Sequence, residues 1–316
     1  MRVLAALGRL PRVVLSGIAW LLAALAVTVG GYRGRVVRAN LRRAFPTWSV
    51  WKRAWTSLVF QRHFTQLLVE SAKLFTLSRR DVEAGMVHHN TALLQRLHRE
   101  GRHVLVAGGH MNNWEWSALT LNQNLPHRTM ALYKRLSNPK AEALMTASRG
   151  RFGLEMVRTK DGKAWMDRAQ SGDPVAVIMG FDQSPADPLK SWWTTFLGVE
   201  TAVFYGMEQW SRQFDMAVVY ASIRRERAWR YTLHYELVAE NVLDLPEGEV
   251  LDRCLAKLER EIHRDPARWL WSHKRWKHAR PDGATLHPRH HHAAPSDHVT
   301  PPLTSNPSPT HLSTHG

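Results

Sequence analysis

The second half of the chain alternates between short apolar runs and longer amphipathic segments, and this alternation restricts the fold more than any other feature. Short apolar runs predict buried strands, whereas apolar residues spaced three or four apart predict helices. The predicted strands are residues 103–109, 129–133, 154–158, 174–180 and 216–223. The predicted helices between them are residues 112–123, 138–151, 163–171 and 205–214. Because strands that alternate with helices pair in parallel through crossover helices, we expect an α/β fold.

Two further segments complete the predicted domain. Residues 227–240, "RAWRYTLHYELVAE", alternate polar and apolar side chains, which is typical of an antiparallel edge strand. Residues 249–265 have the spacing of an amphipathic helix, and Cys254 within them is the only cysteine of the chain. A single cysteine cannot form an internal disulfide or a cysteine-based metal site. We therefore expect Cys254 to be a packing residue.

Composition limits the partners of the chain. Its 316 residues are 44% hydrophobic, which is enough for a large core and excludes wholesale disorder. The formal net charge is +16, and such an excess favours nucleic acid, an anionic membrane or an acidic partner protein. Basic residues that precede the first acidic residue, Glu70, include Arg33, Arg35, Arg38, Arg42, Arg43, Lys52 and Arg53. The 14 tryptophans add a preference for membrane interfaces and apolar pockets.

An uncharged stretch near the N-terminus predicts a membrane anchor. Residues 13–32, between Arg12 and Arg33, form a run of 20 residues without charge, and ~20 apolar residues in a helix match a ~30 Å hydrocarbon core. A cleaved signal peptide would have a shorter apolar region and a small-residue cleavage site, which "VTVGG" does not supply. Because the stronger basic cluster follows the run, the body of the protein is expected on the cytoplasmic side. A buried soluble helix is the alternative.

The segment after this run predicts two basic amphipathic helices. Apolar residues recur at helical spacing in "RVVRANLRRAFPTWS" and in "WTSLVFQRHFTQLLVESAKLF", with long basic side chains between them. Phe45 and Pro46 end the first helix, and Ser49 can cap the second. Beside an anchor, such helices are expected to lie on an anionic leaflet, although a solvated charged face would have the same pattern.

The C-terminal residues change in composition after Pro281. Residues 281–316 are rich in proline, histidine, serine and threonine, so we expect a disordered tail. Its "HPRHHH" run can bind a metal only weakly, because flexible histidines have no fixed geometry. A surface tail is therefore expected.

The stretch "AGGHMNNWEW" carries the main candidates for chemistry. His110 follows a predicted strand directly, and active residues in open α/β sheets gather at the carboxyl ends of strands. Two glycines permit a tight turn, and Asn112 or Asn113 can cap the following helix. In one continuous helix, His110 and Glu115 would point about 140° apart, so they meet only if His110 lies in the turn. A carboxylate bound to an imidazole fixes its tautomer and stabilises the imidazolium.

The surroundings of this stretch resemble one protein family. "GGHMNNWEW" resembles the "GHFGNWE" site of the bacterial lipid A biosynthesis (lauroyl/myristoyl) acyltransferases, which belong to the lysophospholipid acyltransferase superfamily. Further blocks that are similar and in the same order are "RVVRANLRRAFP", "YKRLSNPKAEALMTASRGRFG", "GDPVAVIMGFDQSP", "TTFLGVETAVFYGME" and "WLWSHKRWK". Met-Asn replaces Phe-Gly within the histidine motif, and Leu197 replaces the second Phe before Gly198. These departures leave the acyl-chain and acceptor preference open.

The resemblance implies a fold and a reaction. The fold would be a glycerol-3-phosphate-acyltransferase-like αβα sandwich with an N-terminal membrane-anchor helix. His110 would be a general base oriented by Glu115. It would deprotonate an acceptor hydroxyl for attack on an acyl thioester, and general-base assistance is typically worth ~10²–10⁴-fold. No serine or cysteine stands beside the pair as a nucleophile. No cofactor or metal is implied.

The resemblance also implies substrate-binding residues. Arg149 matches the family's arginine and can bind an acceptor phosphate or developing negative charge, although a surface arginine at a helix end is the alternative. Asp182 and Gln183 can position the acceptor, or they form only a polar turn before Pro185. Further candidates are Tyr133 and Lys134 for the acceptor and Phe196 and Gly198 for an acyl pocket. Trp269, Trp271 and Trp276 are expected in the core or at an interface.

These interpretations divide the chain into four parts. They are a membrane anchor (1–32), a basic amphipathic helical segment (33–80), the α/β acyltransferase domain (81–280) and the disordered tail (281–316). The expected location is the cytoplasmic face of a bacterial inner membrane, with anionic lipids and a lipid A precursor as partners. The acyl donor would be acyl carrier protein or coenzyme A, and the basic surface favours the acidic carrier protein.

Other functions fit the sequence less well. A nucleic-acid-binding protein would explain the charge, but no helix-turn-helix, zinc module or aromatic single-strand platform stands out. His-x4-Glu is not the His-Glu-x-x-His arrangement of a zinc hydrolase. Acyl transfer to another membrane lipid, a lysophospholipid or an aminolipid, is the main alternative. A membrane scaffold without catalysis is a further one.

Overall fold

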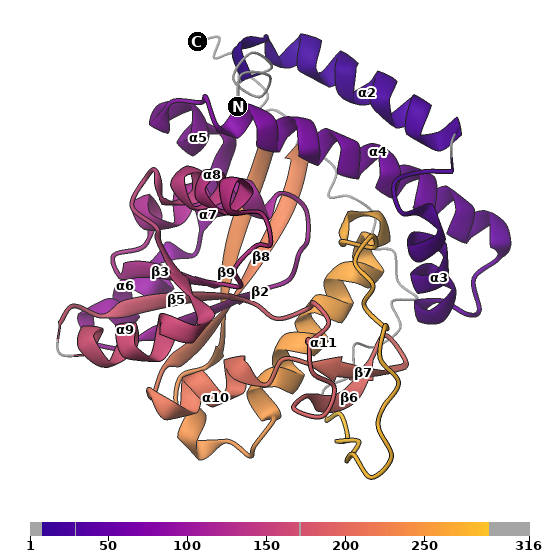
Figure 1. Ribbon diagram of the computed structural model, residues 1–316. Helices are drawn as coiled ribbons and strands as arrows, with labels where there is room; N and C mark the ends of the chain where they lie inside the picture. The colour runs from indigo at the N-terminus through magenta and orange to yellow at the C-terminus, as the bar shows by residue number, and fades with distance from the viewer. Residues whose placement is uncertain (1–7, 29, 171, 291–316) are drawn as a thin grey trace, which may run out of the picture.

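A seven-stranded, mostly parallel sheet forms the centre of the protein (Figure 1). The computed structural model describes residues 8–28, 30–170 and 172–290. Only β8 and β9 pair in an antiparallel manner within this sheet. In spatial order the strands are β1 (Met86–His89), β9 (Arg230–Ala239), β8 (Ala217–Arg227), β2 (Val104–Gly108), β5 (Val175–Gly180), β3 (Arg128–Tyr133) and β4 (Glu155–Arg158). The predicted α/β fold with a mostly parallel sheet is confirmed.

Helices cover both faces of the sheet, because the central strand β2 is apolar on both sides. Val104 and Val106 pack in one buried cluster with α6 and α7, whereas Leu105 and Ala107 pack in the other with α10 and α11. A fully buried strand of this kind has a continuous apolar run. The helices of the α/β part are α5 (Arg79–Gly85), α6 (Thr91–Arg99), α7 (Trp114–Asn124), α8 (Pro139–Gly150), α9 (Gly162–Ala169), α10 (Gly206–Gln213) and α11 (Glu249–Arg264).

Two parts of the strand arrangement differ from the prediction. β9 is antiparallel to β8 as expected, but it is not the edge, because β1 pairs with its outer side in parallel. A separate hairpin, β6 (Trp192–Phe196) and β7 (Val199–Val203), was also not predicted. Its two turn residues, Leu197 and Gly198, both have positive φ, 51° and 74°, as a tight two-residue hairpin turn requires.

The first three described helices pack together beside the sheet: α2 (Arg12–Thr28), α3 (Gly34–Ala44) and α4 (Val50–Leu74). α3 ends before Phe45 and Pro46, and the Ser49 side chain accepts a hydrogen bond from the Lys52 amide at the start of α4, as predicted. α2 lies along α4 (Figure 1). These helices are therefore a packed part of the protein.

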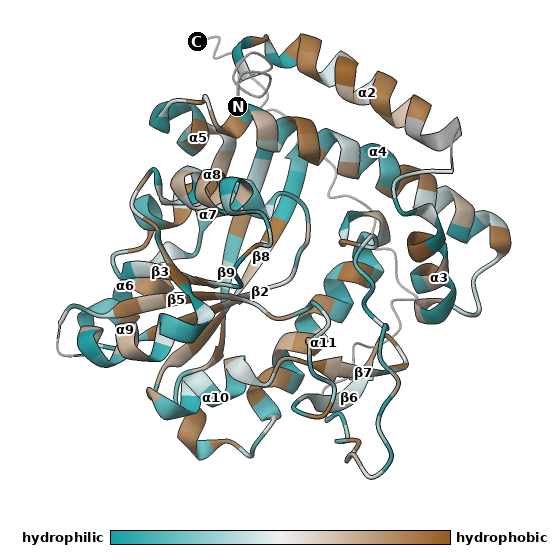
Figure 2. Cartoon of the chain, in the orientation of Figure 1, coloured by the Kyte–Doolittle hydropathy of each residue, from teal (hydrophilic) through white to brown (hydrophobic). Residues whose placement is uncertain are grey.

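The expected membrane-spanning helix is not found. In the described part of the chain, no helix combines the length and the apolar character needed to cross a bilayer. Helix α2 has 17 residues from Arg12 and contains residues 13–28 of the uncharged run, and the positive φ angles of Gly30 and Gly31 follow it. One side of α2 is buried through Leu15, Ala19 and Ala23. Its other side is also apolar but exposed, so brown residues recur along the helix in Figure 2.

The tail prediction is wrong for its first residues. Arg289 is buried and forms ion pairs with Asp252 and Glu259 of α11. It also donates a hydrogen bond of 2.6 Å to the Thr195 carbonyl oxygen of β6, and the His287 amide donates to Trp193 O. Buried carboxylates thus hold a segment whose composition predicts disorder. The remaining tail prediction, for residues 291–316, lies outside the described residues.

Candidate active site

His110 lies in the turn between β2 and α7, at the carboxyl end of the central strand. Asn113 caps α7 by accepting a hydrogen bond from the Trp116 amide. Small residues leave room for the turn, since a Cβ on Gly109 would be 2.5 Å from the Leu258 side chain. A Cβ on Gly180, at the end of the neighbouring strand β5, would be 3.0 Å from the His110 ring. The two glycines therefore make the space that the imidazole occupies.

Asp182 is the carboxylate that binds His110. Its Oδ1 lies 2.5 Å from His110 Nδ1, and its Oδ2 accepts the His110 backbone N–H at 2.8 Å. Trp269 Nε1 donates a third hydrogen bond, of 2.7 Å, to Oδ2. Asp182 follows β5, which pairs directly with β2, so the ends of the two parallel strands bring the residues together. The result is an Asp–His dyad whose carboxylate is buried.

The environment sets the protonation of this dyad. Burial alone would lower the pKa of His110, but the charge of Asp182 and its hydrogen bond raise that pKa above the usual value. Burial would raise the pKa of Asp182, whereas His110 and the donated hydrogen bonds lower it below its usual range. With Asp182 on Nδ1, the neutral imidazole carries its proton there and presents Nε2 as a base.

His110 and Asp182 differ in how far they are exposed to solvent. The His110 side chain is 22% exposed, whereas that of Asp182 is 2% exposed. Nε2 of His110 lies 3.2 Å from the side-chain nitrogen of Gln183, whose amide can donate toward it. The predicted positions of Asp182 and Gln183 at the strand end are thus confirmed, but Asp182 contacts the base.

The predicted contact between His110 and Glu115 is wrong. Glu115 binds Arg149 through two hydrogen bonds, of 2.9 Å to Nε and 2.6 Å to Nη2. It also accepts a hydrogen bond from Trp114 Nε1. The reason is its place in the first turn of α7, which faces the last turn of α8. Arg149 is therefore held by a carboxylate, and its predicted role as a phosphate ligand is not supported by this geometry.

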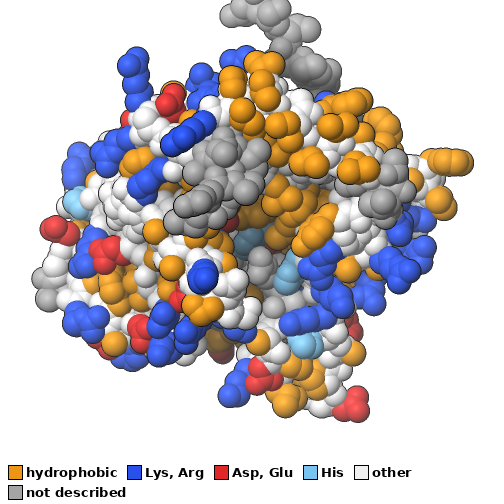
Figure 3. Space-filling model, turned by 45° about the horizontal axis from the view of Figure 1, so that its top comes forward, with side chains coloured by type: hydrophobic (Ala, Val, Ile, Leu, Met, Phe, Trp, Pro, Cys, Tyr) orange, Lys and Arg blue, Asp and Glu red, His pale blue; other side chains and the backbone are white. Residues whose placement is uncertain are grey.

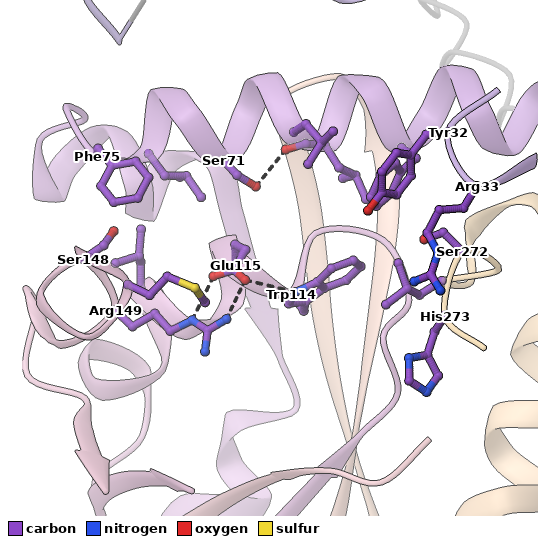
Figure 4. A pocket seen from close by; sticks show the side chains of 17 residues that line it. Tyr32, Arg33, Ser71, Phe75, Trp114, Glu115, Ser148, Arg149, Ser272 and His273 are labelled. Carbon is purple, nitrogen blue, oxygen red and sulfur yellow. Dashed lines mark hydrogen bonds and ion pairs between the residues drawn. The ribbon is translucent and has the colours of Figure 1, made fainter. Parts of the chain in front are cut away.

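A cavity of about 410 Å³ lies between α4 and the ends of α7 and α8 (Figure 4). This volume falls within the ~300–1,000 Å³ typical of ligand sites. Glu115 and Arg149 line it, as does Trp114, whose ring packs edge-on against His110 at 5.2 Å. The other lining side chains are mainly apolar and include Phe64, Leu67, Leu68, Phe75, Leu119 and Met145. The dyad is thus next to an apolar cavity.

Three predicted binding residues lie away from this cavity. Tyr133 donates a hydrogen bond to Glu142 on α8. Phe196 is fully buried in the core, and Gly198 is in the turn of the β6–β7 hairpin. None of these three lines the cavity. Phe196 and Gly198 are therefore not part of this cavity, and the acyl pocket expected at these two residues stays a prediction.

The tryptophans of the C-terminal part are buried as predicted, namely Trp269, Trp271 and Trp276, and so is Cys254. The sequence interpretation missed the contact of Trp269 with Asp182. The Phe196 ring packs edge-on against Trp269 at 5.7 Å, which fixes the indole. Trp269 is thus a positioning residue of the dyad.

Comparisons with known proteins match most of the chain. The model of a family described as bacterial lipid A biosynthesis acyltransferase matches residues 1–278. A search of curated proteins found no match. The matched range includes the dyad, the cavity and the N-terminal helices, and it ends before the segment that contains Arg289.

Proposed function

The chain belongs to the bacterial lipid A biosynthesis acyltransferase family, and we propose that it is an acyltransferase of membrane lipids. In this proposal, it transfers a fatty acyl chain from a thioester donor to a hydroxyl of a lipid A precursor or related glycolipid. The observation that carries this proposal is the His110–Asp182 dyad, whose imidazole packs against Trp114 in the wall of an apolar cavity. An acceptor hydroxyl is a weak nucleophile, so it needs a base at this position.

The proposed step uses His110 first as a base and then as an acid. Nε2 removes the proton of the acceptor hydroxyl while the hydroxyl oxygen attacks the carbonyl carbon of the thioester. The C–S bond then breaks, and the imidazolium returns the proton to the leaving sulfur. Asp182 stabilises the imidazolium formed between these events, because its negatively charged carboxylate is hydrogen-bonded to Nδ1 of His110. Gln183 supplies an amide N–H beside Nε2 of His110. In this proposal, that N–H lies close to the thioester carbonyl oxygen, on which negative charge develops.

Glu115 has a different role in this proposal. It holds the guanidinium of Arg149 in the cavity wall, and Nη1 is the group of that guanidinium not used by Glu115. Bidentate pairs of this kind fix orientation as well as charge. Glu115 therefore shapes the substrate site through Arg149, and its effect on His110 is a smaller electrostatic one.

We place the reaction at an anionic membrane, on the cytoplasmic face of the bacterial inner membrane. The outer side of α2 exposes Trp20, Leu21 and Leu25, and the first turns of α4 expose Trp51 and Trp55. Figure 3 shows such hydrophobic side chains gathered on this side of the molecule, with basic side chains beside them. Apolar helix faces flanked by basic residues favour the surface of an anionic bilayer. The donor in this proposal is acyl carrier protein or coenzyme A.

Mass spectrometry of membrane lipids, with and without the protein, tests the proposal. We expect one lipid to gain the mass of one acyl chain, which identifies both the chain and the acceptor. The His110→Ala variant should stay folded, with a Tm lowered by the loss of one hydrogen bond to Asp182, and lose single-turnover acyl transfer by ~10²–10⁴-fold. Normal transfer by this folded variant would refute the mechanism, and no mass change in any lipid would refute the function.

A further inference from the structure

One end of the cavity is lined by polar and basic side chains. Arg33, Ser272 and His273 lie together there, and Phe75 with the Glu115–Arg149 pair lies at the opposite end (Figure 4). Arg33 comes from the turn between α2 and α3, whereas Ser272 and His273 follow the last short helix, Pro266–Arg268. The polar end is thus built by segments far apart in the sequence.

The groups at this end present hydrogen-bond donors. Arg33 has five N–H donors and no acceptor, and it forms no ion pair with any described residue. His273 Nε2 accepts the Ser184 backbone N–H at 2.8 Å, so its proton lies on Nδ1. Burial lowers the pKa of His273 to about 4, so the ring is neutral at pH 7. The hydroxyl of Ser272, which is 4% exposed, adds a third donor.

A cluster of donors with one unpaired cation fits an anion. The cation at the other end, Arg149, does not serve this purpose because Glu115 neutralises it. Between the two ends, the wall is apolar, with Phe64, Leu67 and Leu68 from α4 among its residues. The cavity therefore suits an amphiphile whose charged group binds at Arg33 and whose hydrocarbon extends along α4.

We propose that Arg33, Ser272 and His273 form a phosphate subsite, in which Arg33 selects the phosphate-bearing substrate. This inference rests on the proposed function for the identity of the substrate. Two sources share this chemistry: a phosphate on the glycolipid acceptor and the phosphodiester of a pantetheine-bearing donor. Phosphate suits the site because its oxygens accept several hydrogen bonds at once, and charge-assisted bonds are the strong ones.

A binding experiment tests the subsite without catalysis. Isothermal titration of the full chain with dodecyl phosphate, below its critical micelle concentration, is compared with titration by neutral dodecyl maltoside. Arg33→Gln should weaken dodecyl phosphate binding roughly 10–100-fold and leave dodecyl maltoside unchanged. Arg80→Gln removes an equal charge from the exposed start of α5 and should change neither. Unchanged binding of dodecyl phosphate, or an equal loss for both amphiphiles, overturns the proposal.

Steady-state kinetics identify the source of the phosphate. Arg33→Gln should raise the KM of one substrate by a similar factor with little change in kcat. If the acceptor KM rises, and a dephosphorylated acceptor shows no such rise, the acceptor phosphate binds at Arg33. If only the donor KM rises, the donor phosphate binds there, and two unchanged KM values overturn the proposal. A wild-type protein without transfer refutes the proposed function, whereas the titration still decides the subsite.

Discussion

Two carboxylates near the cavity differ in what surrounds them. Asp182, at the end of β5, is 2% exposed and accepts hydrogen bonds from His110 and Trp269. Glu115, in the first turn of α7, is 26% exposed and binds Arg149 in the cavity wall. His110 and Glu115 lie in the same sequence motif, but in the fold His110 is hydrogen-bonded to Asp182. Strand order, rather than distance along the chain, thus selects the carboxylate that binds His110.

The largest effect should come from Asp182→Asn. Without the charge, the imidazolium is no longer stabilised, so kcat should fall by ~10²–10⁴-fold. The pKa of His110 should also fall, because burial then dominates, and the acidic limb of the pH–rate profile should move to lower pH. Asp187→Asn, in an exposed loop, is the matched control. An Asp182→Asn enzyme with near-normal kcat would refute the dyad.

The dependence of the wild-type rate on pH should report the pKa of His110 in this dyad. A general base must be neutral, so kcat/KM should rise about tenfold per pH unit on the acidic side and level off above the pKa of His110. That pKa is raised above its ordinary value of 6.5, so the half-maximal rate should lie above pH 6.5. Stopped assays across pH 5–9 give the midpoint. A midpoint below 6.5 would show that Asp182 does not control His110.

Glu115→Gln should have a smaller and different effect. The amide cannot hold Arg149 by charge, so the cavity wall loosens and KM should rise roughly tenfold, while the acidic limb moves little. Because both side chains are about a quarter exposed, the free energy of unfolding should change by no more than ~1 kcal/mol. If Glu115→Gln instead reproduced the kcat loss and pH shift of Asp182→Asn, the two carboxylates would have the same role.

Of the three substitutions, Trp269→Phe should have the smallest effect. It removes one hydrogen bond from Asp182 and keeps the charge, so kcat should fall only a few-fold. The less stabilised carboxylate attracts the imidazolium more strongly, so the acidic limb should move slightly to higher pH, opposite to Asp182→Asn. Trp276→Phe is the control, since its indole donates to Thr201 instead. Identical profiles for the two variants would make Trp269 a purely structural residue.

Much of the fold could be predicted because apolar periodicity is a local signal. The buried strands and their crossover helices follow from runs such as the one at β2. β1 was missed because it has four residues, two of them histidine. The β6–β7 turn was missed because Leu197 and Gly198 are not an Asn-Gly or Asp-Gly pair. Short elements gain their stability from pairing partners, which a local pattern does not contain.

The site was predicted in part for a related reason. His110, Asp182 and Gln183 were all placed at strand ends from the sequence. The contact between His110 and Asp182 depends on the pairing of β2 with β5 across 72 positions of the chain. Trp269 was expected in the core or at an interface, but its hydrogen bond to Asp182 joins residues 87 positions apart and could not be predicted from a local pattern. The sequence therefore predicted which residues lie at the site, whereas the contacts between them follow from the order of the strands in the sheet.

The segment that carries Arg289 has a consequence for how such a chain can change during evolution. It lies beyond the range that the family model matches, yet its guanidinium lies against two carboxylates of α11. Both carboxylates are buried, so loss of the guanidinium would remove a charged partner from each of them and destabilise the fold. Lineages that keep Asp252 and Glu259 should then retain a basic residue to cover them.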